Sequence, residues 1–250
     1  MKEVKIPSGD KKLAAVIHDS NERTGKLAIL CPGYLDSKNY AHLVGLAGDL
    51  NDQGYTVVRF DPTGTWGSEG DISDYTTTQY LKDIKSVLEY MLQKGNYNFV
   101  LLGGHSQGGQ LSILYAARDP RISAVLGIMP SSPYSMTLHR REEWESKEFN
   151  ISFRDIPGKT GKIEFRVPYS HIRDRDQYNV LEDVKKVHGP IIFVAGELDT
   201  TVLPEHVKMI YDNANEPKKF ITIPGIGHDY RHNPEEIKRV NGEILKLLPT

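Results

Sequence analysis

Cysteine is nearly absent from this sequence, since Cys31 is the single one in 250 residues. A lone cysteine excludes an intrachain disulfide and a metal site built from several cysteines, and it fits a reducing compartment. The sequence has no run near the roughly 20 apolar residues that a membrane-spanning helix needs. Residues 1–7 lack the apolar core of a signal peptide. We therefore expect a cytoplasmic protein without a membrane partner.

The chain also lacks an excess of one charge. Its 31 basic and 33 acidic residues leave a net charge of -2, which gives no electrostatic basis for binding nucleic acid. Apolar residues make up 38% of the 250 residues, which is enough for one domain with a well-buried core. We expect residues 1–250 to form a single domain, a monomer or a homodimer, with no nucleic-acid partner.

Short apolar runs typical of strands alternate with segments of helical periodicity along most of the sequence. The expected strands cover residues 4–6, 13–17, 27–31, 56–60, 99–102, 124–129, 191–195 and 219–223, and the expected helices cover residues 43–50, 77–93, 107–117, 204–213 and 234–248. This alternation is typical of a mainly parallel sheet with helices on both faces. We predict an α/β fold around a sheet of about eight strands.

The alternation stops between residues 131 and 179. Nine basic and eight acidic residues lie in this segment, and their mixed signs predict a solvated insertion rather than a like-charged tail. Residues 151–153 and 163–167 alternate apolar with polar around a glycine-containing turn, which predicts a hairpin. Because the insertion follows a strand of a parallel sheet, it emerges at the carboxyl edge, where sites in such folds lie. We expect it to form a small cap over that edge.

The stretch with the clearest chemical meaning is Gly104-His105-Ser106-Gln107-Gly108. It follows an apolar strand and opens a helix, which is the context of a nucleophile elbow. The sharp turn of an elbow puts its serine in a strained backbone conformation with the hydroxyl exposed, and side chains at the flanking glycines would collide across the turn. We predict that Ser106 is a catalytic nucleophile.

A serine nucleophile needs a base, and in elbow-based folds the chain order is serine, acid, histidine. Three histidines follow the plausible acids. His206 lies in a helical segment and His232 lies close to a helix start, whereas His228 lies in a glycine-containing loop after a strand. We expect His228 to be the base, with His232 as the weaker alternative.

The acid follows the strand over residues 191–195, where both Glu197 and Asp199 are within reach of the same loop. Asp199 is favoured because Gly196 lets the chain turn before it, and because Thr200 and Thr201 can form hydrogen bonds around it. Glu197 remains the alternative acid.

An acyl-transfer site also needs backbone N–H groups that stabilise an oxyanion. One should come from Gln107, the residue after the nucleophile, and one from the loop after the strand over residues 27–31. In that loop Gly33 permits close approach of the backbone, so Tyr34 is the expected second donor. Tyr134 and Trp144 of the insertion are candidate walls of a substrate pocket.

Cofactor and metal motifs are missing. The histidines are scattered without the spacing typical of a metal site, and the glycines around Ser106 lack the pattern of a dinucleotide-binding loop. We expect no metal and no cofactor, and a small-molecule ester as the partner.

Together these residues resemble the α/β-hydrolase superfamily over essentially the whole chain, and within it the small bacterial carboxylesterases of the cinnamoyl and feruloyl esterase type. The motifs that carry the resemblance are Pro32-Gly33-Tyr34, Arg59-Phe60-Asp61 with Gly64, Gly67-Ser68-Glu69-Gly70, Gly104-His105-Ser106-Gln107-Gly108-Gly109, Gly196-Glu197-Leu198-Asp199 and Gly227-His228. The insertion matches the place where that family carries its cap. One departure is that the oxyanion turn begins Pro32-Gly33, where the family usually has His-Gly, so a side chain that often braces this turn is missing.

The resemblance and the three catalytic candidates imply a serine carboxylesterase that hydrolyses small soluble esters, short-acyl or hydroxycinnamoyl, through an acyl-serine. The same residues would also serve a thioesterase, a lipase, an acyltransferase or a serine peptidase-like enzyme. A binding protein on the same scaffold would have no need to keep nucleophile, acid and base together, so an enzyme is favoured.

Overall fold

Along the central strands, successive buried side chains pack alternately on the two faces of the sheet. In the computed structural model, which describes residues 1–20 and 24–248, β3 (Lys26–Cys31) shows the pattern clearly. Its Leu27, Ile29 and Cys31 belong to one hydrophobic cluster, and Ala28 and Leu30 belong to a second. Successive residues of a strand point to opposite faces, so both faces of the sheet are buried.

Eight strands form one sheet in the order β1-β2-β4-β3-β5-β6-β9-β10. Their bounds are β1 Lys2–Ser8, β2 Lys11–His18, β3 Lys26–Cys31, β4 Thr56–Phe60, β5 Phe99–His105, β6 Ala124–Ile128, β9 Ile191–Gly196 and β10 Lys218–Ile223. The first two strands form an antiparallel hairpin, and β2 pairs antiparallel with β4. All the other pairings are parallel. The α/β class and the predicted mainly parallel sheet of about eight strands are confirmed.

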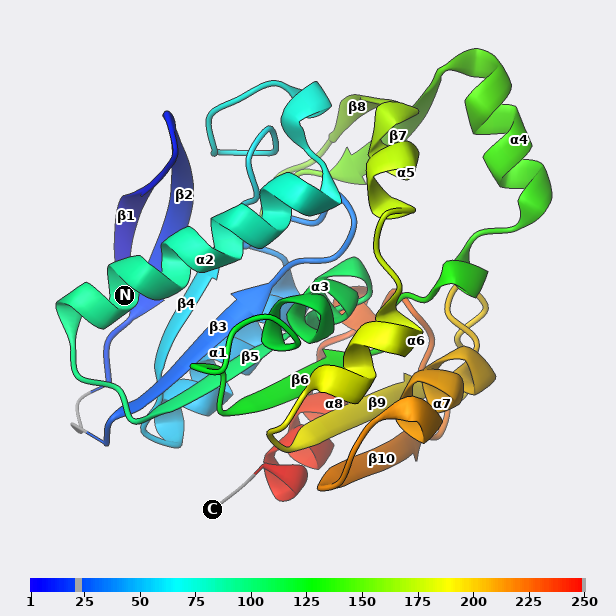
Figure 1. The fold of residues 1–250 in the computed structure, drawn as a ribbon. Helices are drawn as coiled ribbons and strands as arrows, with labels where there is room; N and C mark the ends of the chain where they lie inside the picture. Colours follow the sequence, from blue (N-terminus) through cyan, green and yellow to red (C-terminus); the bar gives the residue numbers. More distant parts are fainter. Residues whose placement is uncertain (21–23, 249–250) are drawn as a thin grey trace.

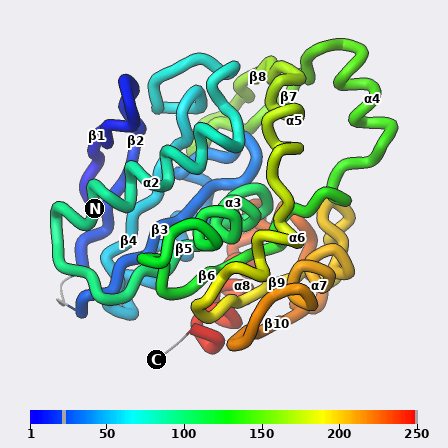
Figure 2. The backbone as a smooth tube through the Cα atoms, viewed as in Figure 1, coloured from blue at the N-terminus to red at the C-terminus, as the bar shows by residue number. Residues whose placement is uncertain are grey.

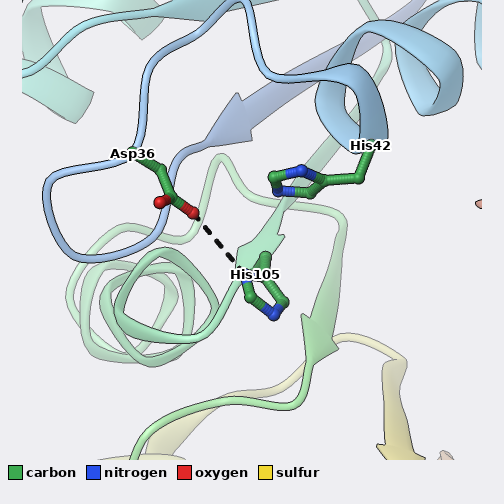
Figure 3. Close-up of side chains that lie close together, drawn as sticks. All are labelled: Asp36, His42 and His105. Atoms are coloured by element: carbon green, nitrogen blue, oxygen red, sulfur yellow. Dashed lines mark ion pairs between the residues drawn. The ribbon is translucent and has the colours of Figure 1, made fainter. Parts of the chain in front are cut away.

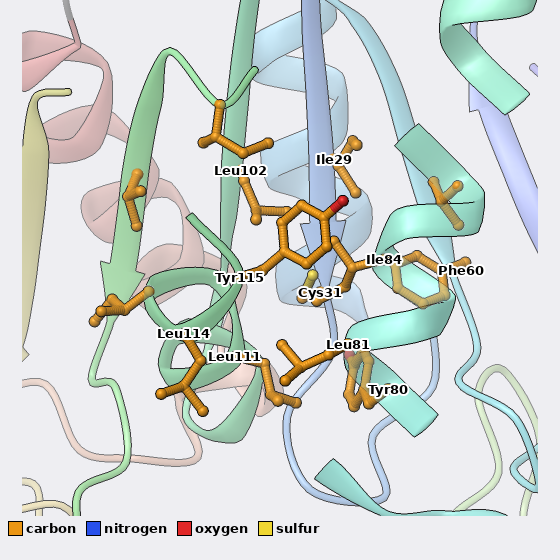
Figure 4. Packing of buried hydrophobic residues seen from close by; sticks show 14 of the residues in the cluster. Ile29, Cys31, Phe60, Tyr80, Leu81, Ile84, Leu102, Leu111, Leu114 and Tyr115 are labelled. Atoms are coloured by element: carbon orange, nitrogen blue, oxygen red, sulfur yellow. The ribbon is translucent and has the colours of Figure 1, made fainter. Parts of the chain in front are cut away.

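Helices cover the sheet on both sides (Figure 1). On one face lie α2 (Thr77–Lys94), α3 (Gln107–Ala116), α6 (Val180–Asp183) and α7 (Pro204–Asn213), and on the other lie α1 (Ala41–Asp52) and α8 (Pro234–Leu247). Figure 4 shows the first of these cores, where Leu81 and Ile84 of α2 and Leu111 of α3 pack over Ile29 and Cys31 of the sheet. Both cores use the apolar faces that the sequence periodicity predicted.

The segment between β6 and β9 leaves the sheet and forms a separate small layer. It contains α4 (Leu138–Lys147), the antiparallel hairpin of β7 (Phe149–Asp155) and β8 (Lys162–Pro168), and α5 (Ser170–Arg175). The tube in Figure 2 shows this layer beyond one end of the central strands. The hairpin was predicted from sequence, whereas α4 was not. Only Trp144 of α4 is buried, so that helix has no apolar stripe to reveal it.

Four short 3₁₀ turns complete the described chain: η1 (Ile72–Asp74), η2 (Pro133–Ser135), η3 (Val184–Lys186) and η4 (Tyr230–His232). Within residues 1–20 and 24–248, none of the helices has the length and apolar character that crossing a membrane requires.

Candidate active site

Ser106 occupies the sharp turn between β5 and α3. Its φ of 53° and ψ of -119° lie in a region that non-glycine residues rarely adopt. Three backbone hydrogen bonds hold this conformation: the Ser106 N–H donates to Ile128 O at 2.8 Å, and the Ser106 carbonyl accepts from Gln110 at 3.1 Å and from Ser131 at 3.0 Å. The surrounding backbone therefore fixes the strained turn that the elbow pattern predicted.

The flanking glycines are required by close backbone contacts. A Cβ atom at Gly108 would lie 2.1 Å from the carbonyl oxygen of Cys31, and one at Gly104 would lie 2.3 Å from the same atom. No side chain fits at such distances, so β3 and the start of α3 can approach only because both positions are glycine. This contact brings the loop after β3 against the elbow.

Ser106, His228 and Asp199 form a chain of hydrogen bonds. The Ser106 Oγ lies 3.0 Å from His228 Nε2, and His228 Nδ1 lies 2.7 Å from Asp199 Oδ2. The other oxygen of Asp199 accepts hydrogen bonds from the backbone N–H groups of Thr201 and Val202, each at 2.8 Å. Asp199 is 2% exposed, so its carboxylate is fixed in orientation and aimed at the imidazole.

The alternative acid and bases lie elsewhere. Glu197 is exposed, and its carboxylate accepts from the backbone N–H of Gly225 at 2.8 Å. The His232 ring is largely exposed and lies 3.9 Å from the Asp155 carboxylate. The His206 ring lies beside Tyr134 at 5.9 Å between centroids. Of the sequence candidates, the structure brings Asp199 and His228 to Ser106.

Two backbone N–H groups in the segments that meet at the elbow have no acceptors. These are the N–H of Gln107, at the start of α3, and the N–H of Tyr34, in the turn closed by the hydrogen bond from Asp36 N to Gly33 O at 3.0 Å. Neither has a hydrogen-bond acceptor in the part of the chain that the structure describes. Free donors at the N-terminus of a helix and in a tight turn are suited to an oxyanion, and these are the two residues for which the sequence analysis predicts that role.

Tyr75, which sequence reasoning missed, ties the two donors together. Its hydroxyl donates to the Gln107 side-chain carbonyl at 2.6 Å and accepts from the Leu35 N–H at 3.2 Å. The hydroxyl of Tyr80 donates to the carbonyl of Pro32 at 2.9 Å. These two tyrosines brace the turn that begins with proline in place of the usual histidine. No motif could have revealed them, because they reach the turn from a distant segment.

A cavity of about 270 Å³ opens beside Ser106, and residues of the 131–179 segment line it together with residues of the sheet edge. Trp144 is one of the lining residues, as proposed from sequence. Its indole N–H donates to Val167 O at 3.2 Å, and its ring stacks on His171 with centroids 6.1 Å apart. With Tyr34, whose ring centroid lies 5.4 Å from that of His171, these rings form an aromatic wall.

Tyr134 was expected in the same wall, and this expectation was wrong. It is 54% exposed and belongs to η2, where its ring faces His206 of α7 rather than the cavity. A residue on a short surface turn has the same sequence signature as a pocket wall, so the sequence alone did not separate the two.

A cluster of buried polar groups underlies the site. Asp36, His42 and His105 come from three different elements, and their potential ligand atoms all lie within 4.8 Å of one another. Figure 3 shows the Asp36 carboxylate and the His105 ring, 3.8 Å apart, with His42 beside them. Their residue types would suit a metal ion, and because they are far apart in sequence, no spacing motif revealed them. However, the Arg231 guanidinium lies 3.4 Å from Asp36 and already balances the carboxylate charge.

The charges in this cluster follow from burial. Burial alone would raise the pKa of Asp36, but the nearby histidines and Arg231 lower it to about 2. Burial lowers the pKa of His42 to about 3, and burial also lowers the pKa of His105, with the charge of His228 adding to the effect. Both rings are therefore neutral near neutral pH. His105 packs against His228 with ring centroids 4.6 Å apart, so a neutral wall supports the imidazole.

Comparisons with known proteins agree with the architecture. A family model described as the alpha/beta hydrolase fold matches residues 27–149. The structure of Est1E from Butyrivibrio proteoclasticus with bound ferulic acid superposes with a TM-score of 0.78 at 23% identity, covering 97% of this chain and 98% of that one. The alpha/beta hydrolase GrgF from Penicillium sp. sh18 superposes with a TM-score of 0.81 at 19% identity, covering 98% of this chain and 96% of that one. The chain thus has the α/β-hydrolase fold.

A further protein is similar to this chain in sequence as well as in fold. The mitochondrial palmitoyl-protein thioesterase ABHD10 of mouse is 26% identical over 193 residues, which cover 76% of this chain and 64% of that protein. This chain therefore spans just under two thirds of the length of that curated relative. These matches agree with the predicted resemblance to the α/β-hydrolase superfamily, and the solved structures, which are 19–23% identical to this chain, share its fold.

We predict that His42 makes the stability of the protein dependent on pH. Its folded pKa of about 3 is below the ordinary value of 6.5, so between these values the unfolded chain binds a proton that the folded chain excludes. The free energy of unfolding must therefore fall as pH falls below 6.5, by up to about 1.4 kcal/mol per pH unit for one proton. In His42→Phe this contribution disappears, and urea unfolding between pH 6.5 and 4.5 should show a shallower decline.

His42→Phe and His42→Leu serve as paired variants, because neither ring nitrogen of His42 has a hydrogen-bond partner that either substitution would lose. His139→Phe, at an exposed position of α4, is the control and should keep the wild-type pH dependence. An unchanged slope in both His42 variants would contradict the prediction.

Proposed function

We propose that this protein is a serine hydrolase that cleaves small, soluble carboxylic esters through an acyl-serine intermediate. The observation that carries the proposal is the hydrogen-bond chain from Ser106 through His228 to Asp199, at a cavity that Tyr34 and Gln107, the two residues with free backbone N–H groups, also line. Nucleophile, base, orienting acid and oxyanion donors are the parts that acyl transfer needs.

The reaction follows from the positions of these atoms. His228 Nε2 takes the proton of Ser106 as its Oγ attacks the carbonyl carbon, and Asp199 holds the Nδ1–H and stabilises the imidazolium that forms. The negative charge on the carbonyl oxygen is met by the two backbone N–H groups. The C–O bond of the ester then breaks, and His228 gives its proton to the leaving alcohol. A water molecule repeats the sequence and releases the acid.

The cavity supports small substrates with an aromatic or short acyl group. Its aromatic wall of Tyr34, Trp144 and His171 suits a planar acyl group, and the resemblance to Est1E, solved with ferulic acid, points the same way. Polar and charged residues supply much of the remaining lining, which is unfavourable for a long alkyl chain.

A thioesterase is the second candidate, favoured by the match to ABHD10. The same acyl-serine forms from an oxygen ester or a thioester, so the residues serve both reactions. What separates them is the leaving group and the acyl chain, which only turnover can decide.

The Ser106→Ala variant should lose covalent labelling by a fluorophosphonate probe and lose ester turnover, because no other group replaces the Oγ nucleophile. The expected loss in kcat is about 10⁴–10⁶-fold. Ser86→Ala, in α2 and not among the cavity-lining residues described, removes a hydroxyl that donates to Ser8 of β1 at 3.2 Å and should keep both properties. If Ser106→Ala keeps a tenth of wild-type activity in a clean preparation, the nucleophile is another residue.

The Asp199→Asn variant should lower kcat by about 10³–10⁴-fold, because the imidazole loses its orientation and its charge partner while the base itself remains. Glu197→Gln removes a comparable carboxylate in the same loop and should stay within a few-fold of wild type, since Glu197 bonds a backbone N–H away from His228. Steady-state kinetics on one ester compare the two. The reverse ranking would assign the acid to Glu197.

Matched oxygen esters and thioesters with acyl chains of two to sixteen carbons should separate the candidate activities. We expect kcat/KM to be highest for short or aromatic acyl oxygen esters, with no jump in rate when substrate exceeds its solubility limit, because the charged cavity disfavours long chains. A preference for long-chain thioesters would instead favour the thioesterase, and activation by emulsified substrate would favour a lipase.

A further inference from the structure

The cavity beside Ser106 is lined by four arginines: Arg140 of α4, Arg154 of β7, Arg175 of α5 and Arg231 of η4. The first three come from three different elements of the 131–179 segment, so this segment supplies positive charge from several directions. Among the lining residues in the described chain, the carboxylates are Asp36 and Asp229. The balance of charge around the cavity is therefore positive.

Arg231 forms ion pairs with both of these carboxylates. Its Nη1 lies 2.8 Å from Asp229 and 3.4 Å from Asp36, and its Nη2 lies 3.7 Å from Asp155. The guanidinium also lies over the ring of Tyr40. The Arg231 charge is thus balanced by carboxylates of the protein. The excess positive charge of the cavity lining belongs to the other three arginines.

Arg175 has no carboxylate of its own. The nearest one, on Asp176, is 3.7 Å away, which is too long for a strong hydrogen bond. Asp176 instead binds Arg141 through both of its oxygens. The Arg175 side chain is 20% exposed, and burial lowers its pKa, although a guanidinium stays charged in proteins. A positive charge is therefore held largely out of water beside one distant carboxylate, which Arg175 shares with Arg141.

Arg154 and Arg140 add two further positive charges to the cavity lining. Arg154 donates from Nη2 to the carbonyl of Tyr34 at 2.8 Å, but its Nε is buried without any acceptor. Arg140 is exposed at the cavity wall. Within residues 1–20 and 24–248 neither side chain forms an ion pair. A buried donor without an acceptor, such as the Arg154 Nε, costs free energy, which is recovered when a ligand supplies the missing anion.

We propose that the cavity binds esters that also carry a free carboxylate, and that Arg175, Arg154 and Arg140 hold this carboxylate while Ser106 attacks the ester bond. The inference rests on the proposed function and assigns its substrate class. The nucleophile comes from the sheet edge and the three arginines from the segment between β6 and β9, so a substrate with an ester and an acid group would span the cavity. Guanidinium groups suit a carboxylate because they donate two parallel hydrogen bonds.

Two matched pairs of substrates test the proposal. In the first, the 2-naphthyl monoester of a six-carbon dicarboxylic acid is compared with its methyl-capped diester, which places the charge on the acyl half. In the second, the acetyl ester of a hydroxyphenylpropionic acid is compared with the corresponding primary amide, which places it on the alcohol half. We expect kcat/KM to favour the charged member of one pair by about tenfold or more, and this ratio to shrink at high ionic strength.

The Arg175→Gln variant should lower that charged-to-neutral ratio by about tenfold, whereas Arg175→Lys should retain part of it. Arg173→Gln is the matched control, because Arg173 lies on the same short helix, packs over Tyr169 and is not among the lining residues described. It should leave the ratio unchanged. Arg140→Gln, at an exposed position, provides a second variant if Arg175→Gln does not fold, and it should lower the ratio in the same direction.

The outcomes separate this inference from the proposed function. If the protein takes no fluorophosphonate label and hydrolyses neither member of either pair, the serine-hydrolase proposal fails. If it is labelled and hydrolyses the neutral members as fast as the charged ones, with the ratio unmoved by Arg175→Gln or Arg140→Gln, the proposed function stands and the carboxylate site is wrong.

Discussion

The close approach of the backbone after β3 to the elbow is the constraint on which the site depends. Gly104 and Gly108 lie so near the carbonyl of Cys31 that any side chain would separate the strand from the helix. Because these segments touch, Tyr34 and Gln107 line the same cavity as Ser106. The hydroxyl of Tyr75 then links the two segments by hydrogen bonds on either side. A pair of free donors in a fixed place costs no reorganisation when charge develops between them.

Much of this could be predicted from the sequence, because the informative signals are local. Strands buried on both faces are continuous apolar runs, an elbow needs its two glycines, and the acid and histidine loops follow strands in a set order. These signals led to Ser106, Asp199 and His228 and to the eight-stranded sheet. Helix α4 was missed because a helix with one buried residue has no periodic pattern.

What the sequence could not indicate depends on contacts between distant segments. Tyr75 reaches the oxyanion turn across more than thirty positions, and Asp36, His42 and His105 meet from separate elements. The excess of arginine around the cavity was equally hidden. The 131–179 segment has nearly balanced charge, and only the fold shows that three of its arginines line the cavity while none of its acidic residues is among the lining residues described. Composition reports the sum of charges, and recognition depends on where each one lies.

In the proposed function, the chemistry and the recognition of the substrate come from different parts of the chain, and Arg154 contacts both parts. Ser106, His228 and Asp199 stand at the ends of sheet strands or just after them, where rigid backbone holds them, whereas the arginines and the aromatic wall belong mostly to the inserted layer. Arg154 donates to the carbonyl of Tyr34, the residue proposed as an oxyanion donor. An anion bound to the Arg154 guanidinium would thus act on the same turn that is proposed to supply an oxyanion donor, so in this proposal binding of the substrate carboxylate affects the geometry around Ser106.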